Sequence, residues 1–298
     1  MKAPLFPHDK LFLIAGPCVL ESNDLNLRVA EHLAKLAPLV PGGIIFKASF
    51  DKANRSNAGA ARGPGIEMGL KTLSRVGEET GLPLLTDVHL PEQCAQVATV
   101  ANVLQIPAFL CRQTDLLVAA GATGKAVNIK KGQWMHPEGM KGAVDKVRGA
   151  SVGPERRKRI AGTPPGHPER REKAKLSIPM PKREIAVTER GSFFGYGDLV
   201  VDMRSFVRMR AACEVPVIFD ATHSVQQPGK GTGGASGGAR EFIPPLMLAA
   251  IGAGADGLFL ETHPDPDRAP SDGPNMVPLK DLETLLKKAV DLWDRVRR

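Results

Sequence analysis

Long apolar runs are missing from this sequence, and their absence is the first constraint on what the protein does. No stretch reaches the roughly 18 apolar residues that a membrane-spanning helix needs, so we expect no membrane partner. The amino terminus lacks the long apolar region and the cleavage pattern of a signal peptide, since residues 12–15 already have the pattern of a strand. We therefore expect a cytoplasmic protein.

Cysteines and nucleotide-binding glycine motifs are also scarce. The four cysteines are widely scattered along 298 residues, and their spacing indicates no disulfide framework. The chain has no GxxxxGK sequence followed by Ser or Thr, and no glycine-rich dinucleotide turn follows its first apolar run. These absences argue against a P-loop and against a dinucleotide-binding fold.

Positive charge is concentrated in one segment. The net charge is +8, and residues 148–184 contain eleven Lys/Arg and only four Asp/Glu. Residues 148–183 have six prolines and no Phe, Trp or Tyr, so this segment cannot bury enough apolar surface to offset chain entropy. We predict a single domain over 1–298 with a flexible basic insertion at 148–183. Without aromatic residues for base stacking, a solvated insertion is favoured over an arm for RNA or a membrane surface.

Short apolar runs alternate with helical patterns along the rest of the chain. The runs cover 11–16, 43–49, 83–89, 103–109, 126–131, 184–190, 216–223 and 257–263, and helical patterns such as 24–37 and 241–255 lie between them. Apolar strands separated by helices are typical of a parallel sheet covered on both faces. Eight such units in a chain of this length predict an α/β fold, a (β/α)8 TIM barrel. A doubly wound sheet is the alternative.

Almost every apolar run ends in a residue that can carry chemistry. The ends bear Cys18, Lys47, Asp87, His89, Gln105, Lys130, Lys131, Glu189, Arg190, Asp220, His223, Glu261 and His263. Polar groups are common in loops, which explains any one of these residues without a function. All of them together are better explained by a barrel, in which the carboxyl ends of the strands form one active-site mouth.

Cations at this mouth predict an anionic substrate. Lys47, Lys52, Arg55, Lys130 and Arg190 would concentrate positive charge there, which suits phosphate and carboxylate groups. A plain surface cation is the alternative for each residue. That alternative is weakest for Lys47, which lies inside an apolar run where an unpaired ammonium would be costly to bury.

A second group of residues has the chemistry of a metal site. Cys18, His223, Glu261 and Asp272 offer a thiolate, an imidazole and two carboxylates, a set suited to Zn, Fe, Mn or Co. A lone cysteine is more often packed than ligating. The preference reverses here because the ends of strands 1, 7 and 8 are neighbours in a closed barrel. His263 is a rival ligand, but it lies two residues from Glu261 in a strand, and the sequence HPDPD also suits a structural role for it in the loop.

The stretch 226–242 contains six glycines after the seventh strand. Its richness in glycine fits a mobile lid or a turn that approaches a phosphate, and we favour the lid.

Several blocks of the sequence resemble one enzyme family, the 3-deoxy-D-manno-octulosonate 8-phosphate synthases, also called 2-dehydro-3-deoxyphosphooctonate aldolases. The blocks are FKASFDKANRSN, RGPGIEMGL, TDVH, QIPAFLCRQTDLL, NIKKGQ, TERGSFFGYGDLVVDMRS, FDATHSVQQPG, SGGAREF and ETHPDPDRAPSDGP. Together they extend from Leu11 to about Leu285, interrupted by the basic insertion. The resemblance implies a (β/α)8 barrel, usually a homotetramer. It also implies condensation of phosphoenolpyruvate with D-arabinose 5-phosphate and water, giving an eight-carbon sugar acid phosphate for the lipopolysaccharide core and free phosphate.

The same resemblance assigns roles to individual residues. Phosphoenolpyruvate would be held by Lys47, Lys52, Lys130 and Arg190, assisted by Arg112 and the backbone near Ala108. Arabinose 5-phosphate would be bound by Asn54, Arg55 and Ser56, with Arg55 coming from a neighbouring subunit. The pocket would be lined by Asp87, His89, Gln105 and Gln226. The catalytic residues would be the four cations that hold phosphoenolpyruvate together with the metal ligands His223 and Asp272.

Family knowledge also bears on Cys18. A metal-dependent branch carries cysteine at this position and a metal-free branch carries asparagine, so the chain resembles the metal-dependent branch. The insertion departs from the family pattern, and so do Trp134 and His136 in KGQWMHP. Trp134 would either reshape the sugar end of the pocket or simply pack.

Two other functions compete with this interpretation. A 3-deoxy-D-arabino-heptulosonate 7-phosphate synthase would use erythrose 4-phosphate in the same chemistry, but its sugar-phosphate loop has a Lys-Pro-Arg core, whereas this chain has KANRS at 52–56. A basic RNA-binding protein on a barrel scaffold is the distant alternative, and we expect no nucleic-acid partner.

Overall fold

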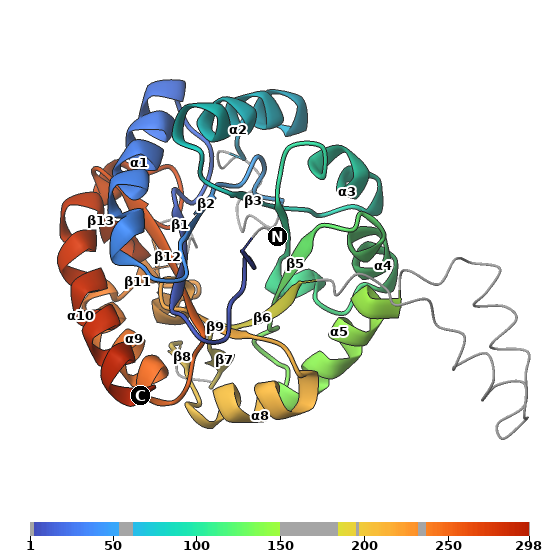
Figure 1. Cartoon of the computed structure of the whole chain (residues 1–298), viewed down its shortest axis with the longest axis vertical. Helices are drawn as coiled ribbons and strands as arrows, with labels where there is room; N and C mark the ends of the chain where they lie inside the picture. Colours follow the sequence, from blue (N-terminus) through green and yellow to red (C-terminus); the bar gives the residue numbers. More distant parts are fainter. Residues whose placement is uncertain (1–2, 54–61, 150–183, 195–196, 232–236, 298) are drawn as a thin grey trace, which may run out of the picture.

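Eight parallel strands close into a barrel because the last of them pairs with the first. In the computed structural model, which describes residues 3–53, 62–149, 184–194, 197–231 and 237–297, β1 pairs in parallel with both β2 and β12. The order around the barrel is β1 (Phe12–Gly16), β2 (Ile44–Lys47), β3 (Leu84–Asp87), β4 (Val103–Ile106), β5 (Ala126–Lys130), β6 (Ile185–Glu189), β9 (Val217–Asp220) and β12 (Gly257–His263). Figure 1 looks along this ring of strands. The predicted TIM barrel is confirmed, and the doubly wound sheet is excluded.

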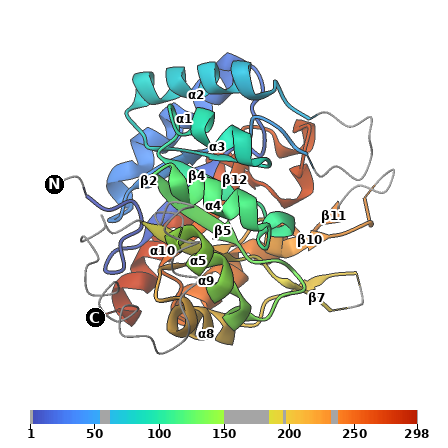
Figure 2. The same cartoon turned by 90° about the vertical axis from the view of Figure 1, so that its right-hand side faces the viewer.

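Helices form an outer ring around the strands (Figures 1 and 2). They are α1 (Asn23–Leu36), α2 (Ile66–Thr80), α3 (Pro91–Val97), α4 (Thr114–Ala122), α5 (Met140–Gly149), α8 (Arg204–Cys213), α9 (Ile243–Gly252) and α10 (Leu282–Val296). Local signals set their ends: the Ser22 hydroxyl accepts from the Leu25 amide at the start of α1, and Gly81 ends α2 in a left-handed conformation. Their buried faces and the outward-facing strand residues make the larger hydrophobic core.

The inner face of the barrel changes from apolar to polar along each strand. Successive strand residues point to opposite faces, so residues two apart share the interior. Ile45, Leu85, Val103, Ile218 and Phe259 belong to the inner apolar cluster. The residues two positions later are Lys47, Asp87, Gln105, Asp220 and Glu261, all of them buried. The polar layer therefore lies at the carboxyl ends of the strands.

The amino-terminal segment fills the opposite end of the barrel. Phe6 packs against Phe12, with ring centroids 5.6 Å apart, and joins the inner apolar cluster. The backbone amides of Leu5 and Phe6 both donate to Glu184 Oε2, at 2.5 Å and 3.1 Å respectively. In Figure 1 the amino terminus accordingly lies near the middle of the ring. Apolar packing thus closes the end of the barrel away from the polar layer.

Short strands and turns extend the carboxyl ends of the barrel strands. Pairs form between β7 (Ser192–Phe193) and β8 (Leu199–Val200), and between β10 (Gln226–Gln227) and β11 (Gly237–Gly238), while β13 (Val277–Pro278) adds to β12. Gly238 approaches the loop after β12 so closely that a Cβ would lie 1.8 Å from Asn275 Oδ1. Glycine there lets the two segments approach each other without displacing the Asn275 side chain.

The predicted insertion at 148–183 falls almost entirely outside the described residues. Its flanks are α5, which ends at Gly149, and β6, which begins at Ile185. Both flanks lie at the amino end of β6, away from the polar layer. In the described part of the chain, no helix is long and apolar enough to cross a membrane. All four cysteines are free and buried.

Candidate active site

The turn after β1 brings Cys18 to the barrel mouth. Gly16 lies so close to β2 that a Cβ would be 2.1 Å from the Lys47 carbonyl oxygen. Only glycine permits this approach, because a larger residue would push the two strands apart. Cys18 follows two residues later and is fully buried, and its carbonyl accepts from Lys47 Nζ at 2.8 Å.

Three of the four predicted metal ligands converge. Ligand atoms of Cys18, Glu261 and Asp272 all lie within 4.8 Å of one another, and Cys18 Sγ is 3.1 Å from Asp272 Oδ2. Glu261 Oε2 is buried with no hydrogen-bond partner among the described residues. Asp272 has a φ of 52°, a left-handed conformation that is uncommon for a residue other than glycine. A divalent cation would satisfy the unpartnered oxygen, so the residues present fit such an ion.

His223, the fourth predicted ligand, lies beside this cluster rather than within it. Its Nε2 is 3.7 Å from Glu261 Oε1. Its Nδ1 faces the other way and lies 2.8 Å from Asp220 Oδ2. A carboxylate that holds one ring nitrogen while the other faces the site is the usual arrangement of a metal-binding histidine.

The predicted cations surround the metal-ligand cluster. Lys47 Nζ lies 2.5 Å from Glu261 Oε1, and Lys52 Nζ lies 4.0 Å from the same oxygen. Lys130 Nζ lies 2.6 Å from Asp220 Oδ2. These ammonium groups are buried or nearly so, and a carboxylate accompanies each of them, as the cost of burying an ion requires.

Arg190 and Gln226 connect the cations to Asp272. Arg190 Nη2 donates to Gln226 Oε1 at 2.5 Å, and Gln226 Nε2 donates to Asp272 Oδ1 at 2.8 Å. Arg190 Nη1 is buried without a partner among the described residues. This guanidinium therefore keeps donor capacity for an anion.

Burial shifts the pKa values of several groups at the mouth. It raises the pKa of the Cys18 thiol, and the neighbouring Glu261 carboxylate adds to the effect. Burial lowers the pKa of Lys130, although the nearby Asp220 carboxylate opposes it. Burial raises the pKa of the Glu261 carboxyl, but the Lys47 cation outweighs it, so the net shift is downward. A divalent cation would favour the Cys18 thiolate, since a coordinating thiol loses its proton.

Asp87 and Gln105 belong to a hydrogen-bonded row across the barrel. Asp87 accepts from Ser49 Oγ at 2.5 Å and from Gln105 Nε2 at 2.6 Å. The row continues from Asn128 Nδ2 to Gln105 Oε1 at 2.9 Å and from Thr188 Oγ1 to Asn128 Oδ1 at 2.7 Å. Because every member is satisfied, the row holds the Asp87 carboxylate rigidly beneath the mouth.

The other predicted pocket residues lie at different depths. His89 is half-buried, packs edge-on against Phe50 at 5.9 Å, and has an unpartnered buried Nδ1 among the described residues. Ala108 is buried, whereas Arg112 is exposed and its carbonyl accepts from Lys146 Nζ at 2.9 Å. The predicted sugar-phosphate ligands Asn54, Arg55 and Ser56 lie outside the described residues, as do residues 232–236 of the glycine-rich stretch 226–242.

The two departures from the family pattern have local contacts. Trp134 is 46% exposed and stacks at a tilt on Phe109, with ring centroids 5.6 Å apart. His136 is exposed and accepts from the Gly139 amide at 3.2 Å, which caps the short helix that follows.

Two residues at the mouth, Ser271 and Asn128, were not identified from the sequence, and His263 has a local contact in its loop. Ser271 Oγ lies 3.1 Å from Cys18 Sγ and donates to Asp272 Oδ2 at 2.9 Å. Asn128 joins the row described above. Asn128 could have been found because it lies two residues before Lys130 on the same strand and so faces the barrel interior as Lys130 does. For Ser271, the sequence offers no signal beyond its position next to Asp272. His263 is not in the three-residue cluster: its Nδ1 accepts from the Asp265 amide at 2.9 Å.

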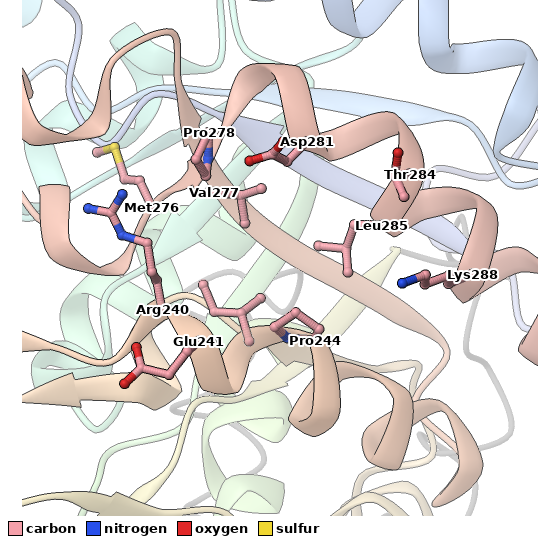
Figure 3. A pocket seen from close by; sticks show the side chains of 11 residues that line it. Arg240, Glu241, Pro244, Met276, Val277, Pro278, Asp281, Thr284, Leu285 and Lys288 are labelled. Carbon is pink, nitrogen blue, oxygen red and sulfur yellow. The ribbon is translucent and has the colours of Figure 1, made fainter.

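A separate cavity of about 460 Å³ lies outside the mouth. It lies between the segment that leads into α9 and the segment from β13 into α10, as Figure 3 shows. Its lining includes Pro244, Val277 and Leu285, with Arg240 at one side and Lys288 at the other. No predicted site residue lines it, so the barrel mouth remains the candidate active site.

A barrel with cations and potential metal ligands gathered at its polar end is suited to binding anionic substrates. Comparison with known sequences identifies the protein family to which this barrel belongs. Residues 7–298 match the DAHP synthetase I family, so the chain belongs to this family. The match includes the whole of the barrel and its mouth.

Individual relatives within this family carry a more specific name. The chain is 50% identical to the 2-dehydro-3-deoxyphosphooctonate aldolase of Nitrobacter hamburgensis over 278 residues, covering 93% of this chain and 86% of the relative. It is also 50% identical to the proteins of that name from Nitratidesulfovibrio vulgaris and Methylobacterium radiotolerans, covering 95% and 98% of this chain and 92% of each relative. The predicted family is confirmed.

Proposed function

We propose that this protein condenses phosphoenolpyruvate with D-arabinose 5-phosphate and water to give 3-deoxy-D-manno-octulosonate 8-phosphate and phosphate. The name shared by its relatives denotes an eight-carbon acid, which a three-carbon and a five-carbon substrate can form. Erythrose 4-phosphate would give only seven carbons, so the heptulosonate alternative is disfavoured. The observation that carries the proposal is the buried cation cluster at the mouth of a barrel of this family.

The cations account for how two anionic substrates can meet. Lys47 and Lys52 approach the mouth from the end of β2, Lys130 from β5 and Arg190 from the end of β6. Their positive charges would offset the repulsion between the substrates. Phosphoenolpyruvate would lie against them, with its carboxylate and phosphate as the matching groups. The same charges would stabilise negative charge that develops during the reaction.

The reaction then follows from the position of the two substrates. Carbon 3 of phosphoenolpyruvate forms a bond to the aldehyde carbon of the sugar, whose oxygen takes up a proton. Water adds at carbon 2 and loses a proton, and phosphate leaves as the bond between carbon 2 and oxygen breaks. Asp87 and His89 at the edge of the pocket, with Gln105 and Gln226, would orient the sugar.

A divalent ion would be held by Cys18, Glu261 and Asp272, with His223 completing the set. Zn, Fe, Mn and Co all suit these donors. The ion would act as a Lewis acid on a substrate oxygen or lower the pKa of a bound water. The protein's part is to hold these side chains in place through Lys47, Ser271 and the carboxylate behind His223.

The assembly and the sugar-phosphate site are part of the same proposal. The protein would act as a cytoplasmic homotetramer, with Asn54 and Ser56 binding the sugar phosphate and Arg55 reaching it from a neighbouring subunit. Arg112 and the Ala108 backbone would assist in binding phosphoenolpyruvate. The basic insertion at 148–183 would remain apart from the reaction because its flanks lie at the amino end of the barrel.

Phosphate release with two sugars tests the proposed function. Purified protein with phosphoenolpyruvate and Mn²⁺ should release phosphate with D-arabinose 5-phosphate at least a hundred times faster than with erythrose 4-phosphate. The eight-carbon product is checked by mass. Faster turnover with erythrose 4-phosphate would move the chain to the heptulosonate branch. No turnover with either sugar would refute the synthase assignment.

A further inference from the structure

Asp220 at the end of β9 serves two functional side chains at once. Its Oδ2 lies 2.6 Å from Lys130 Nζ and 2.8 Å from His223 Nδ1. Its Oδ1 accepts from the His223 backbone amide at 2.9 Å. Asp220 is fully buried, so no part of the carboxylate depends on solvent for its partners.

These contacts determine how His223 is presented to the site. An ionised carboxylate only accepts hydrogen bonds, so Nδ1 must carry the proton. The ring is therefore held with Nε2 directed toward Glu261, 3.7 Å away. The bond to the His223 amide fixes the backbone of the same turn, which leaves the ring little freedom to rotate.

Lys130 is held from two sides. Its ammonium lies against Asp220 and 3.6 Å from the centroid of the Phe259 ring on β12. A cation over an aromatic face is attracted to it, and this attraction strengthens when water is excluded. Asp220 therefore fixes the position at which the Lys130 ammonium meets a substrate anion. It acts on the substrate through Lys130, since its carboxylate is directed at the lysine.

We propose that Asp220 is a positioning residue that orients the metal ligand His223 and the anion-binding Lys130 through one shared carboxylate. The link to phosphoenolpyruvate rests on the proposed function, whereas the link to the metal rests on the ligand geometry alone. A change at Asp220 would thus weaken metal binding and phosphoenolpyruvate binding together.

The test compares Asp220→Asn with Asp256→Asn. The amide of the first variant keeps the shape of the side chain but removes its charge and one of its two acceptor oxygens. Asp256 is an equally buried carboxylate beside the amino end of β9, where it accepts from the Val217 amide at 2.8 Å and pairs with Arg210. This control loses a buried carboxylate far from the mouth.

We expect Asp220→Asn to weaken Mn²⁺ binding, measured by titration without substrates, by 10- to 100-fold, as loss of a group behind a ligand does. The KM for phosphoenolpyruvate, measured at saturating Mn²⁺, should rise at least tenfold while the KM for the sugar phosphate changes less than threefold. Asp256→Asn should leave both quantities within twofold of the parent. Mn²⁺ affinity of Asp220→Asn within twofold of the parent would overturn the proposal.

Failure of the synthase assignment can be told apart from failure of this inference. If the parent condenses neither sugar, the metal titration still decides the role of Asp220. If Asp220→Asn does not fold, the metal titration is replaced by a measurement on the parent protein. Nitrogen NMR of the metal-free parent with isotope-labelled histidines then reports which ring nitrogen of His223 carries the proton. His223 should show a protonated Nδ1 and a bare Nε2, assigned from the signal lost in His223→Gln. The opposite tautomer would overturn the proposal.

Discussion

Replacing Lys47 with methionine tests whether the cations of the mouth are held by buried charge pairs. Lys47 and Glu261 are 1% and 0% exposed, and the two charged groups are 2.5 Å apart. Removing Lys47 leaves the buried Glu261 carboxylate without its nearest cation, since Lys52 Nζ is 4.0 Å away. Breaking a buried pair in this way costs about 3–5 kcal/mol. Methionine keeps much of the apolar volume of the lysine stem, so the lost charge dominates the effect.

An exposed pair supplies a matched control. Lys287 and Glu283 on α10 are 2.7 Å apart, but their side chains are 61% and 48% exposed. Lys287→Met should cost only about 0.3–0.5 kcal/mol, the value typical of surface pairs spaced four residues apart on a helix. The two variants thus share the chemistry and nearly the distance, and they differ in burial.

Urea unfolding followed by circular dichroism, with a chelator present, would give both free energies. Mn²⁺ should then stabilise Lys47→Met more than the parent, because Glu261 is no longer held by an ammonium and a competing positive charge is gone. An ion at a hundred times its Kd adds about 2.7 kcal/mol to the free energy of unfolding. A loss below about 1 kcal/mol in the metal-free variant would refute the reasoning about this pair.

Three further predictions follow from the same structure. Chelation of the metal should abolish turnover, and Cys18→Ser should weaken Mn²⁺ binding. Cys18→Asn should retain some turnover without metal. Full activity of the parent in the presence of a chelator would contradict the metal role. The pKa of Asp87 is lowered because the Lys47 and Lys52 cations outweigh burial, which acts in the opposite direction. The stability from this shift is therefore complete above the unfolded pKa of about 3.9 and decreases as the pH falls from there toward the lower folded pKa. The parent should accordingly lose stability more steeply than Asp87→Asn in urea unfolding from pH 5 to 2. Deleting residues 151–181 with a short linker should leave kcat within a few-fold, and complete loss in a folded variant would place that segment at the active site.

The order of the barrel could be read from the sequence because local rules governed it. Eight apolar runs separated by helical patterns predicted eight strands, and the structure places a barrel strand within each run. The closure of the barrel also followed, since Cys18, His223 and Glu261 were expected on neighbouring strands and β12 pairs with both β1 and β9. The grouping of cations at one end of the barrel could be predicted from the strand order alone, because each of these cations lies at or after the carboxyl end of a strand.

The contacts among those residues could not be read in the same way. The bond from Arg190 to Gln226 and then to Asp272 joins three separate loops, and nothing in the local sequence pairs these side chains. The same holds for Ser271, which serves Cys18 from the far end of the chain. Such contacts depend on side-chain direction and loop path, which no residue pattern specifies.

The sequence by itself therefore determined the barrel, the end at which the site lies and the chemical types gathered there. Strand periodicity of two encodes which face each residue occupies, and a parallel barrel brings all carboxyl ends to one side. Only the tertiary structure decided that one carboxylate, Asp220, serves both Lys130 and His223. It also decided that one Glu261 oxygen has no hydrogen-bond partner within the described part of the chain. The physical reason is that hydrogen bonds form or fail within a few tenths of an ångström, a scale at which only packing positions a side chain.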